Sequence, residues 1–368
     1  MRELKICHVV GARPNFMKVA PVLRVLRGYA GVDQFVVHTG QHYDFNMSDV
    51  FFQQLEVAPP DVNLQVGSGS HAQQTAEIMT RFEPVVLQRR PDLVLVYGDV
   101  NSTVAAALVC AKLGIAVGHV EAGLRSFDRS MPEEINRLVT DQLADLLFTP
   151  SEDGNANLVR EGVSPEKVHL AGNVMIDTLV RMLPAARQTV TADVPERFVL
   201  VTLHRPSNVD DSEWLDELLE ALAGIGQETP VLFPVHPRTR QQLGARGKSL
   251  AGARGIRLMD PLPYLQFLGL QTRATVVVTD SGGIQEETTF LGVPCLTVRE
   301  NTERPVTVTM GTNLLVGRDL QKLCDEVERA LNGSGRKKSV VPPLWDGHAA
   351  ERIAAVIVGE AVAAIAQG

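Results

Sequence analysis

The sequence predicts an α/β protein with two doubly wound parallel sheets, and two patterns support this. Short runs that are nearly continuous in Val, Leu and Ile alternate with segments of helical period. Such runs are typical of parallel strands buried on both faces, and their alternation with helices indicates βαβ units. The runs also fall into two series along the chain. They cover residues 4–10, 35–40, 93–99, 116–123, 146–151 and 168–173, and then 198–204, 231–236, 256–261, 275–283, 294–300 and 313–317.

The gap between the two series indicates where the domains divide. A chain of 368 residues favours two domains over one. Residues 182–197 lack strong periodicity and contain prolines, so we expect the linker there. The N-terminal domain is then 1–181 and the C-terminal domain 198–348. The Ala-rich end, 349–368, reads as a helix that packs back on the first domain.

Composition excludes several classes of partner. The formal net charge of −8 argues against a nucleic acid or an anionic membrane as the main partner. Four cysteines are scattered without a CxxC pair, which indicates neither a disulfide framework nor a zinc site. No apolar stretch reaches the length of a membrane helix. We therefore expect a cytoplasmic protein.

Polar and charged residues follow nearly every apolar run at its C-terminal end. In open α/β sheets, ligands bind outside the carboxyl ends of the strands. Two such sheets facing each other would line one cleft between the domains. Ordinary loops are also polar, but they favour Ser, Asn, Asp and Gly. This set is instead rich in Arg, His and paired carboxylates, which favours a binding cleft.

Carboxylates at strand ends mark the first domain. Asp99 and Glu121 each terminate an apolar run, where an unpaired acid is costly to bury. The segment MPEEINR adds Glu133, Glu134 and Arg137 on the first turns of a helix, and Glu133 and Arg137, four apart, can share one face. Converging acids can divide into acid and base roles. The alternatives are a metal site, disfavoured because no HExxH-like spacing occurs, and simple helix N-terminal charges for Glu133 and Glu134.

The segment DSGGIQEE indicates a phosphate site in the second domain. It follows a strand and opens a helix, and Gly282 and Gly283 let the backbone approach a ligand closely. Glu287 lies one turn in, where it can accept a hydrogen bond from a ribose hydroxyl. The alternative is a capped helix start with Ser281 as N-cap, which leaves the two glycines unexplained.

Several cations could complete a diphosphate site. Neither GxGxxG nor a P-loop motif is present. Instead, GARPNFMK offers Arg13 and Lys18, and Arg304 follows a later strand. His204 and His236 each end a strand and are each followed closely by an arginine, so both are expected to face the substrate. Solvated surface cations and structural histidines are the alternatives.

With these residues assembled, the chain resembles the non-hydrolysing UDP-N-acetylglucosamine 2-epimerases. The resemblance runs through GARPNFMK, TGQHYD, YGDVNST, HVEAGLRS, PEEINR, VTLHR, HPRT, DSGGIQEE and GVPCLTVRENTERP in the family's order. It implies a glycosyltransferase-B-like pair of Rossmann-like domains, with UDP held mainly by the second. It also implies no metal, no nicotinamide cofactor and a homodimer.

The resemblance also implies a reaction and roles for the residues. UDP leaves by anti elimination as C2 loses its proton, and it adds back to 2-acetamidoglucal after protonation on the other face. Asp99, Glu121 and Glu133 are then the acid/base candidates, Arg137 orients them, and His204 assists the diphosphate. The positions expected to contact UDP are Arg13, Lys18, Ser281, Gly282, Gly283, Glu287 and Arg304, with Phe267 as the aromatic residue of a loop beside uracil.

Two departures leave the sugar open. Ala12 and Asn15 stand where the first motif more often has Thr and Glu, and this variant also resembles relatives that act on UDP-diacetamido uronic acids. Three further alternatives remain at this stage. They are a hydrolysing 2-epimerase, a glycosyltransferase of the same architecture, and a UDP-sugar sensor without catalytic activity.

Overall fold

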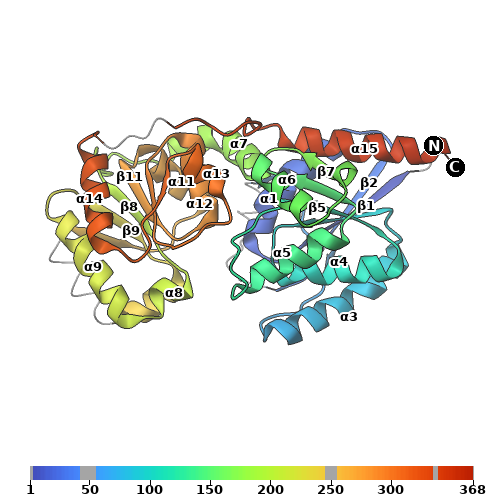
Figure 1. Ribbon diagram of the computed structural model, residues 1–368, viewed down its shortest axis with the longest axis horizontal. Coiled ribbons are helices and arrows are strands. Elements are labelled where there is room, and N and C mark those ends of the chain that lie inside the picture. The colour runs from blue at the N-terminus through green and yellow to red at the C-terminus, as the bar shows by residue number, and fades with distance from the viewer. Residues whose placement is uncertain (1–2, 42–54, 245–254, 335–338, 368) are drawn as a thin grey trace. The chain divides into compact units, whose positions relative to one another are not determined.

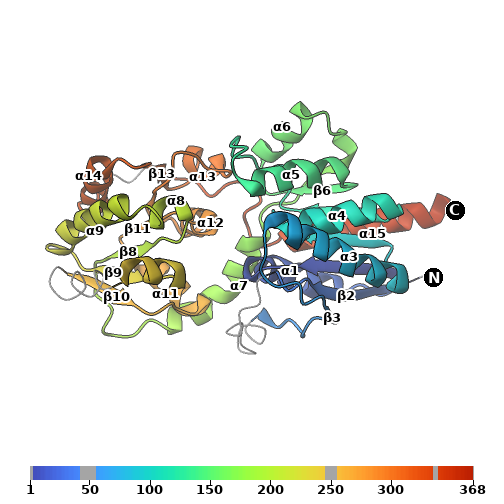
Figure 2. The same ribbon diagram turned by 90° about the horizontal axis from the view of Figure 1, so that it is seen from below.

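The computed structural model describes residues 3–41, 55–244, 255–334 and 339–367, without the side chains of Arg13 and 361–367. The chain divides into two compact units. Unit 1 comprises Met1–Thr178 with Pro343–Gly368, and unit 2 comprises Leu179–Pro342. Each unit contains a parallel sheet with helices on its faces (Figures 1 and 2), which confirms the predicted fold class.

Unit 1 is built on a seven-stranded parallel sheet of order β3-β2-β1-β4-β5-β6-β7. The order reverses between β1 and β4, which pair directly, for example Ile6 with Leu93. Loops that follow these neighbouring strands diverge at such a switch point and leave room for a ligand. The strands are β1 (Leu4–Val10), β2 (Val32–His38), β3 (Val62–Asn63), β4 (Leu93–Tyr97), β5 (Ala116–Val120), β6 (Leu146–Thr149) and β7 (Val168–Leu170).

Helices cover both faces of this sheet. On one face, α4 packs between α3 and α5, and the apolar side chains of β1 and β4 meet those of α3 and α4. On the other, α1 contacts the C-terminal helix α15. The bounds are α1 (Arg13–Leu26), α3 (His71–Arg89), α4 (Asn101–Leu113), α5 (Pro132–Leu143), α6 (Glu152–Arg160), a 3₁₀ turn (Pro165–Lys167), α7 (Val174–Gln188) and α15 (Ala349–Gln367).

A buried carboxylate on α7 fixes the start of α15. Asp177 accepts hydrogen bonds from the backbone N–H groups of Ala349 (3.1 Å) and Ala350 (2.7 Å). These N–H groups have no partner within the helix, so the acid caps it. Burial raises the pKa of Asp177 to about 6 despite these two bonds. Although α15 is long and rich in Ala, neither it nor any other described helix has the length and apolarity needed to cross a bilayer.

Unit 2 repeats the design with a six-stranded parallel sheet of order β10-β9-β8-β11-β12-β13. Its switch point lies between β8 and β11. On one face α9 and α14 bury Trp214, Leu218 and Leu323 in a core. The elements are β8 (Val199–Thr202), α8 (Pro206–Val209), α9 (Ser212–Gly226), β9 (Val231–Pro234), β10 (Ile256–Met259), α11 (Tyr264–Arg273), β11 (Val276–Thr279), α12 (Gly282–Leu291), β12 (Cys295–Thr297), α13 (Pro305–Thr309), β13 (Asn313–Leu315) and α14 (Leu320–Leu331).

Two local predictions are wrong. Residues 182–188, expected in the linker, are the last part of α7, because Pro184 lies inside that helix instead of ending it. Prolines also lie inside α1 and α3, at Pro21 and Pro84, so this chain repeatedly accommodates the missing hydrogen bond. Phe267, expected in a loop beside uracil, lies in the first turn of α11.

The cap of α15 predicts a pH dependence of stability. The carboxyl of Asp177 binds its proton more tightly in the folded chain than in the unfolded one, so the free energy of unfolding falls as pH rises from about 4 to about 6, by up to roughly 3 kcal/mol. Asp177→Asn cannot titrate and is expected to lack this fall. Urea denaturation of both proteins across this range measures the difference. Parallel pH profiles would contradict the prediction.

Candidate active site

Two predicted residues of unit 1 meet against a glycine at the switch point. Gly98 follows β4 with φ +65°, and a Cβ placed there would lie 2.6 Å from Nζ of Lys18 and 3.3 Å from Oε2 of Glu121. Only a residue without a side chain leaves this space. Lys18 from α1 and Glu121 from the loop after β5 form an ion pair here, and both are buried. The pair lies against Gly98, which immediately precedes Asp99 in the chain.

Glu121 has a backbone conformation that side chains seldom adopt. Its φ of +76° lies in the left-handed region. Such conformations cost about 1–3 kcal/mol and occur mostly where surrounding structure imposes them, often at functional sites. Its ammonium partner Lys18 offsets the charge that burial would otherwise disfavour. The fold therefore holds the carboxyl group of Glu121 at this strand end in a fixed orientation.

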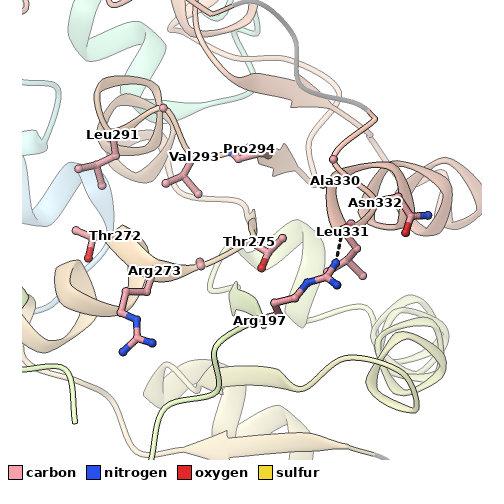
Figure 3. Close-up of a pocket in the computed structure, with 13 residues that line it drawn as sticks. Arg197, Thr272, Arg273, Thr275, Leu291, Val293, Pro294, Ala330, Leu331 and Asn332 are labelled. Carbon is pink, nitrogen blue, oxygen red and sulfur yellow. Dashed lines mark hydrogen bonds between the residues drawn. The ribbon is translucent and has the colours of Figure 1, made fainter. Parts of the chain in front are cut away.

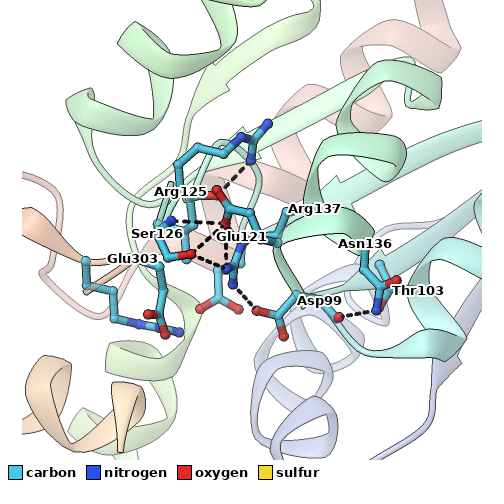
Figure 4. Close-up of polar contacts among 12 residues, drawn as sticks. Asp99, Thr103, Glu121, Arg125, Ser126, Asn136, Arg137 and Glu303 are labelled. Atoms are coloured by element: carbon cyan, nitrogen blue, oxygen red, sulfur yellow. Dashed lines mark hydrogen bonds and ion pairs between the residues drawn. The ribbon is translucent and has the colours of Figure 1, made fainter. Parts of the chain in front are cut away.

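Arg137 holds the second strand-end acid (Figure 4). Its guanidinium is only 2% exposed and forms ion pairs with the carboxylates of Asp99 and Glu134, the latter at 2.7 Å. Asn136, beside it on α5, donates from Nδ2 to the backbone carbonyl of Asp99 at 2.9 Å. The side chain of Asp99 is nevertheless 28% exposed. Asp99 is therefore fixed by Arg137 and Asn136, and its carboxylate remains accessible to a ligand.

Neighbouring acids on α5 have different surroundings. Glu134 is buried and accepts hydrogen bonds from the backbone N–H groups of Ser126 (3.0 Å) and Phe127 (2.9 Å). Burial alone would raise its pKa, but these bonds and Arg137 together lower it. Glu133 is exposed and lines a cavity of about 230 Å³ with Asp99. Other residues around this cavity are Gln41, Ser68, Gly69, His71, Gln74, Val100, Asn101, Pro132 and Asn136.

In unit 2, a buried acid that the sequence analysis did not assign orients His204. Asp280 accepts hydrogen bonds from the backbone N–H groups of His204 (3.0 Å) and Arg205 (2.9 Å), and its Oδ1 lies 2.9 Å from Nδ1 of the His204 ring. Burial would raise the pKa of Asp280, but His204 and the backbone bonds lower it. The carboxylate therefore keeps the proton on Nδ1 and fixes the ring. The His236 ring lies 5.6 Å from that of His204, centroid to centroid.

Arginines gather near the start of α12. Glu303 forms ion pairs with Arg304 (2.5 Å), Arg299 (2.7 Å) and Arg205 (3.7 Å). Burial alone would raise the pKa of Glu303, but the three guanidinium groups lower it well below its usual range. A Cβ on Gly282 would lie 2.5 Å from Nη1 of Arg304, so this glycine admits the arginine to the helix N-terminus. Three guanidinium groups beside free N–H groups suit an anionic ligand, although Arg304 also pairs with the buried Glu286 at 2.8 Å.

The remaining predicted residues of unit 2 lie at the start of α12, within α12 or on α11. Ser281 occupies the N-cap position of α12 but makes no side-chain cap hydrogen bond, so capping does not account for it. Gly283 has open space where a Cβ would point. Glu287 is buried and accepts hydrogen bonds from Tyr264 (2.9 Å) and Gln271 (2.6 Å), and burial raises its pKa. Phe267 packs partly buried against the core that contains Phe198. The side chain of Arg13 lies outside the described residues.

A cavity of about 640 Å³ lies at the other edge of the unit 2 sheet (Figure 3). Its lining includes Arg197 and Thr275, which precede β8 and β11, and the C-terminal ends of α11, α12 and α14. Nη2 of Arg197 donates to the carbonyl of Leu331 at the end of α14. Helix C-termini present carbonyl oxygens and negative partial charge, which disfavours a diphosphate. This cavity is not the candidate site.

Comparison with known proteins agrees with the geometry. The model of a family described as UDP-N-acetylglucosamine 2-epimerase matches residues 24–358. The chain belongs to this family. Similar members include the UDP-N-acetylglucosamine 2-epimerase of Methanococcus maripaludis, 41% identical over 97% of this chain and 99% of that protein. The UDP-2,3-diacetamido-2,3-dideoxy-D-glucuronate 2-epimerase of Pseudomonas aeruginosa is 42% identical over 85% of this chain and 88% of its own.

A solved structure of the family has the same fold. The crystal structure of the Methanocaldococcus jannaschii UDP-GlcNAc 2-epimerase in complex with UDP-GlcNAc and UDP superposes with a TM-score of 0.89. The two sequences are 40% identical, over 96% of this chain and 99% of that one. The resemblance inferred from ordered motifs is thereby confirmed at the level of the family.

The contact at Gly98 predicts a difference between two glycine variants. Gly98→Ala and Gly114→Ala both place a side chain at φ near +65°, and each is expected to lower the free energy of unfolding by about 1 kcal/mol. Gly114 has open space around it, whereas Gly98→Ala displaces Lys18 from Glu121. We expect Gly98→Ala alone to lose turnover of a UDP-sugar. Equal turnover in the two variants would show that the Lys18–Glu121 pair has no catalytic role.

Proposed function

We propose that the protein is a non-hydrolysing isomerase that interconverts UDP-GlcNAc and UDP-ManNAc without a metal or a nicotinamide cofactor. The observation that carries the proposal is the pair of carboxyl groups of Asp99 and Glu121, each fixed by its own buried cation at neighbouring strand ends. Membership of the family and the UDP-GlcNAc complex of the M. jannaschii relative support the same substrate.

The chemistry explains why both units carry charged groups. The C2 proton is not next to a carbonyl, so simple deprotonation would be very difficult. If UDP leaves at the same time, the C2–H electron pair forms the C1–C2 double bond and the C1–O pair departs with the diphosphate. Arg304 and the ring of His204, positioned by Asp280, are suited to stabilise the leaving diphosphate. Atoms and charge balance without any further reagent.

The acids of unit 1 are suited to the proton transfers. One carboxylate takes the C2 proton as UDP leaves, giving 2-acetamidoglucal, and a second acid delivers a proton to the other face before UDP returns to C1. We assign these steps to Asp99, Glu121 and Glu133, with Arg137 holding Asp99. General acid or base groups of this kind typically contribute 10²–10⁴-fold to the rate. Lys18 is assigned here as the partner of Glu121 as well as a diphosphate contact.

Two further properties belong to the same proposal. We infer a homodimer, which the family resemblance implies, and size-exclusion chromatography with light scattering measures it. We also infer a cytoplasmic site of action, where nucleotide sugars are made. Cys7, Cys110, Cys295 and Cys324 are all free thiols, in keeping with a reducing compartment.

Removing either strand-end charge is expected to stop catalysis but not UDP binding. Asp99→Asn and Glu121→Gln keep the side-chain shapes, so kcat should fall about 1,000-fold while the Kd for UDP changes less than about threefold. Proton NMR follows the approach of UDP-GlcNAc to equilibrium with UDP-ManNAc, and calorimetry measures UDP binding. Glu83→Gln, on the exposed side of α3, is the control and should match the wild type.

The same NMR assay separates the alternatives. Steady accumulation of UDP and free sugar would identify a hydrolysing enzyme and contradict the proposal. Faster turnover of a UDP-diacetamido uronate than of UDP-GlcNAc would contradict the assigned sugar. A near-wild-type rate in either carboxylate variant would contradict its assignment.

A further inference from the structure

Behind the strand-end acids of unit 1 lies a buried charged network that the mechanism above does not use. Its centre is Asp141 on α5, one turn beyond Arg137 and 1% exposed. His119 on β5 and Arg125 in the following loop surround it, and both are buried. Burying such groups is costly unless every charge and hydrogen bond is satisfied. Their arrangement therefore calls for an explanation.

Asp141 reaches two loops at once. Its Oδ1 lies 2.6 Å from Nδ1 of His119, whose Nε2 lies 2.8 Å from the backbone carbonyl oxygen of Gly98. Its Oδ2 accepts a hydrogen bond from the backbone N–H of Gly123 at 3.1 Å and contacts Arg125 at 2.7 Å. Gly98 immediately precedes Asp99, and Gly123 follows Glu121 by two residues. The carboxylate of Asp141 is thus linked through His119 to the loop of Asp99 and hydrogen-bonded directly to the loop of Glu121.

The geometry defines the protonation of His119. A carboxylate oxygen and a backbone carbonyl are both acceptors without a proton. Contacts of 2.6 and 2.8 Å to them are both hydrogen bonds only if each ring nitrogen carries a proton, and the proposal below takes the ring in this form. Arg125 supplies a second cation. Its Nε and Nη2 donate to the two carboxylate oxygens of Glu161 at 2.8 and 2.6 Å. Two cations and two anions balance the network.

The titration of Asp141 agrees with this arrangement. Burial alone would raise the pKa of its carboxyl, but His119 and Arg125 outweigh burial and lower it. Asp141 therefore stays ionised and keeps both of its oxygens as acceptors. The groups that face it are His119 from β5 and Arg125 from the loop, so every charge in contact with it has the opposite sign.

The loop after β5 needs such an anchor. Glu121 and Gly123 both have positive φ, +76° and +79°, so the loop departs from the conformations its backbone would ordinarily prefer. A Cβ on Gly123 would lie 2.5 Å from the carbonyl oxygen of Gly154, which shows how closely this loop packs against α6. The hydrogen bond from Gly123 to Asp141 holds the loop in this position.

We propose that Asp141 is a positioning residue for epimerisation, acting through the imidazolium of His119 on the loop of Asp99 and through the N–H of Gly123 on the loop of Glu121. The separation of the two carboxylates then depends on Asp141 as well as on the cations that pair with each of them. This inference rests on the proposed function for its activity readout. Misplacing reacting groups by about 1 Å can cost about 100-fold in rate, so a small shift suffices.

Asp141→Asn tests the proposal with little change of shape. Its amide NH₂ must face one of the donors that now bind a carboxylate oxygen, so one link breaks. We expect kcat to fall about 100-fold while KM and the Kd for UDP change less than about threefold. Asp145→Asn is the matched control. Asp145 also accepts a backbone N–H of β5, from Val117 at 3.0 Å, but at the other end of the strand, and it is half-exposed.

Nitrogen-15 NMR of the wild-type protein provides a readout that needs no active variant. Of the nine histidines, His119 is assigned by the signal that Glu or Gln substitution removes, and His119→Gln is the smaller change. We expect two protonated ring nitrogens for His119 at neutral pH. A neutral ring with one bare nitrogen would overturn the proposal, whether or not Asp141→Asn folds.

The outcomes distinguish the two claims. A wild-type protein that does not epimerise UDP-GlcNAc contradicts the proposed function, and the NMR measurement still tests the imidazolium. Wild-type turnover in Asp141→Asn, or an equal loss in Asp145→Asn, overturns the positioning role while leaving the function intact. A kcat loss confined to Asp141→Asn, with a doubly protonated His119, supports it.

Discussion

The buried guanidinium of Arg137 joins two carboxylates, one from the loop after β4 and one from its own helix. This contact fixes Asp99 relative to helix α5. Removing one partner of a buried ion pair costs about 3–5 kcal/mol, so Glu134, whose side chain is 2% exposed, cannot turn away without leaving a buried charge unpaired. Glu134 also accepts hydrogen bonds from the backbone N–H groups of Ser126 and Phe127, and Asn136 donates one to the carbonyl of Asp99. Helix α5 thereby fixes the acid edge of the sheet.

Unit 2 also depends on buried ion pairs, but with the opposite arrangement of charge. There the buried acids Asp280 and Glu303 pair with cations. Asp280 orients His204, and Glu303 gathers Arg205, Arg299 and Arg304 close to the start of α12. In unit 1, buried cations hold acids at the strand ends. In unit 2, buried acids hold cations. This division suits the proposed elimination, in which a proton and a diphosphate leave the sugar.

Much of this could be predicted from the sequence because apolar periodicity reports burial. Runs of Val, Leu and Ile indicated the parallel strands, and acids directly after them indicated a site at the carboxyl edge. Pairing between distant residues could not be predicted. Lys18 and Glu121 are 103 positions apart, and they meet because β1 pairs with β4 and β4 pairs with β5. Nor does spacing decide between Glu133 and Glu134, because positions three and four residues from Arg137 both suit an ion pair.

Other differences have local causes. Pro184 suggested the end of a helix that continues through it, since a proline inside a helix removes one hydrogen bond but does not always end the helix. Asp280 and Asp141 carry no signal in composition or period, because a buried acid that supports a neighbour has the same sequence pattern as a loop acid. Their roles follow only from which donors surround them.

Solvent exchange at C2 tests the central claim most directly, because it follows the proton that the acids of unit 1 are assigned to move. UDP-GlcNAc is incubated with the wild-type protein in D₂O, and both epimers are recovered and analysed by NMR and mass spectrometry. The account predicts one deuterium at C2 of UDP-GlcNAc and of UDP-ManNAc, and none with Asp99→Asn or Glu121→Gln. Epimerisation without deuterium at C2, or binding of UDP-GlcNAc with no exchange, would contradict it.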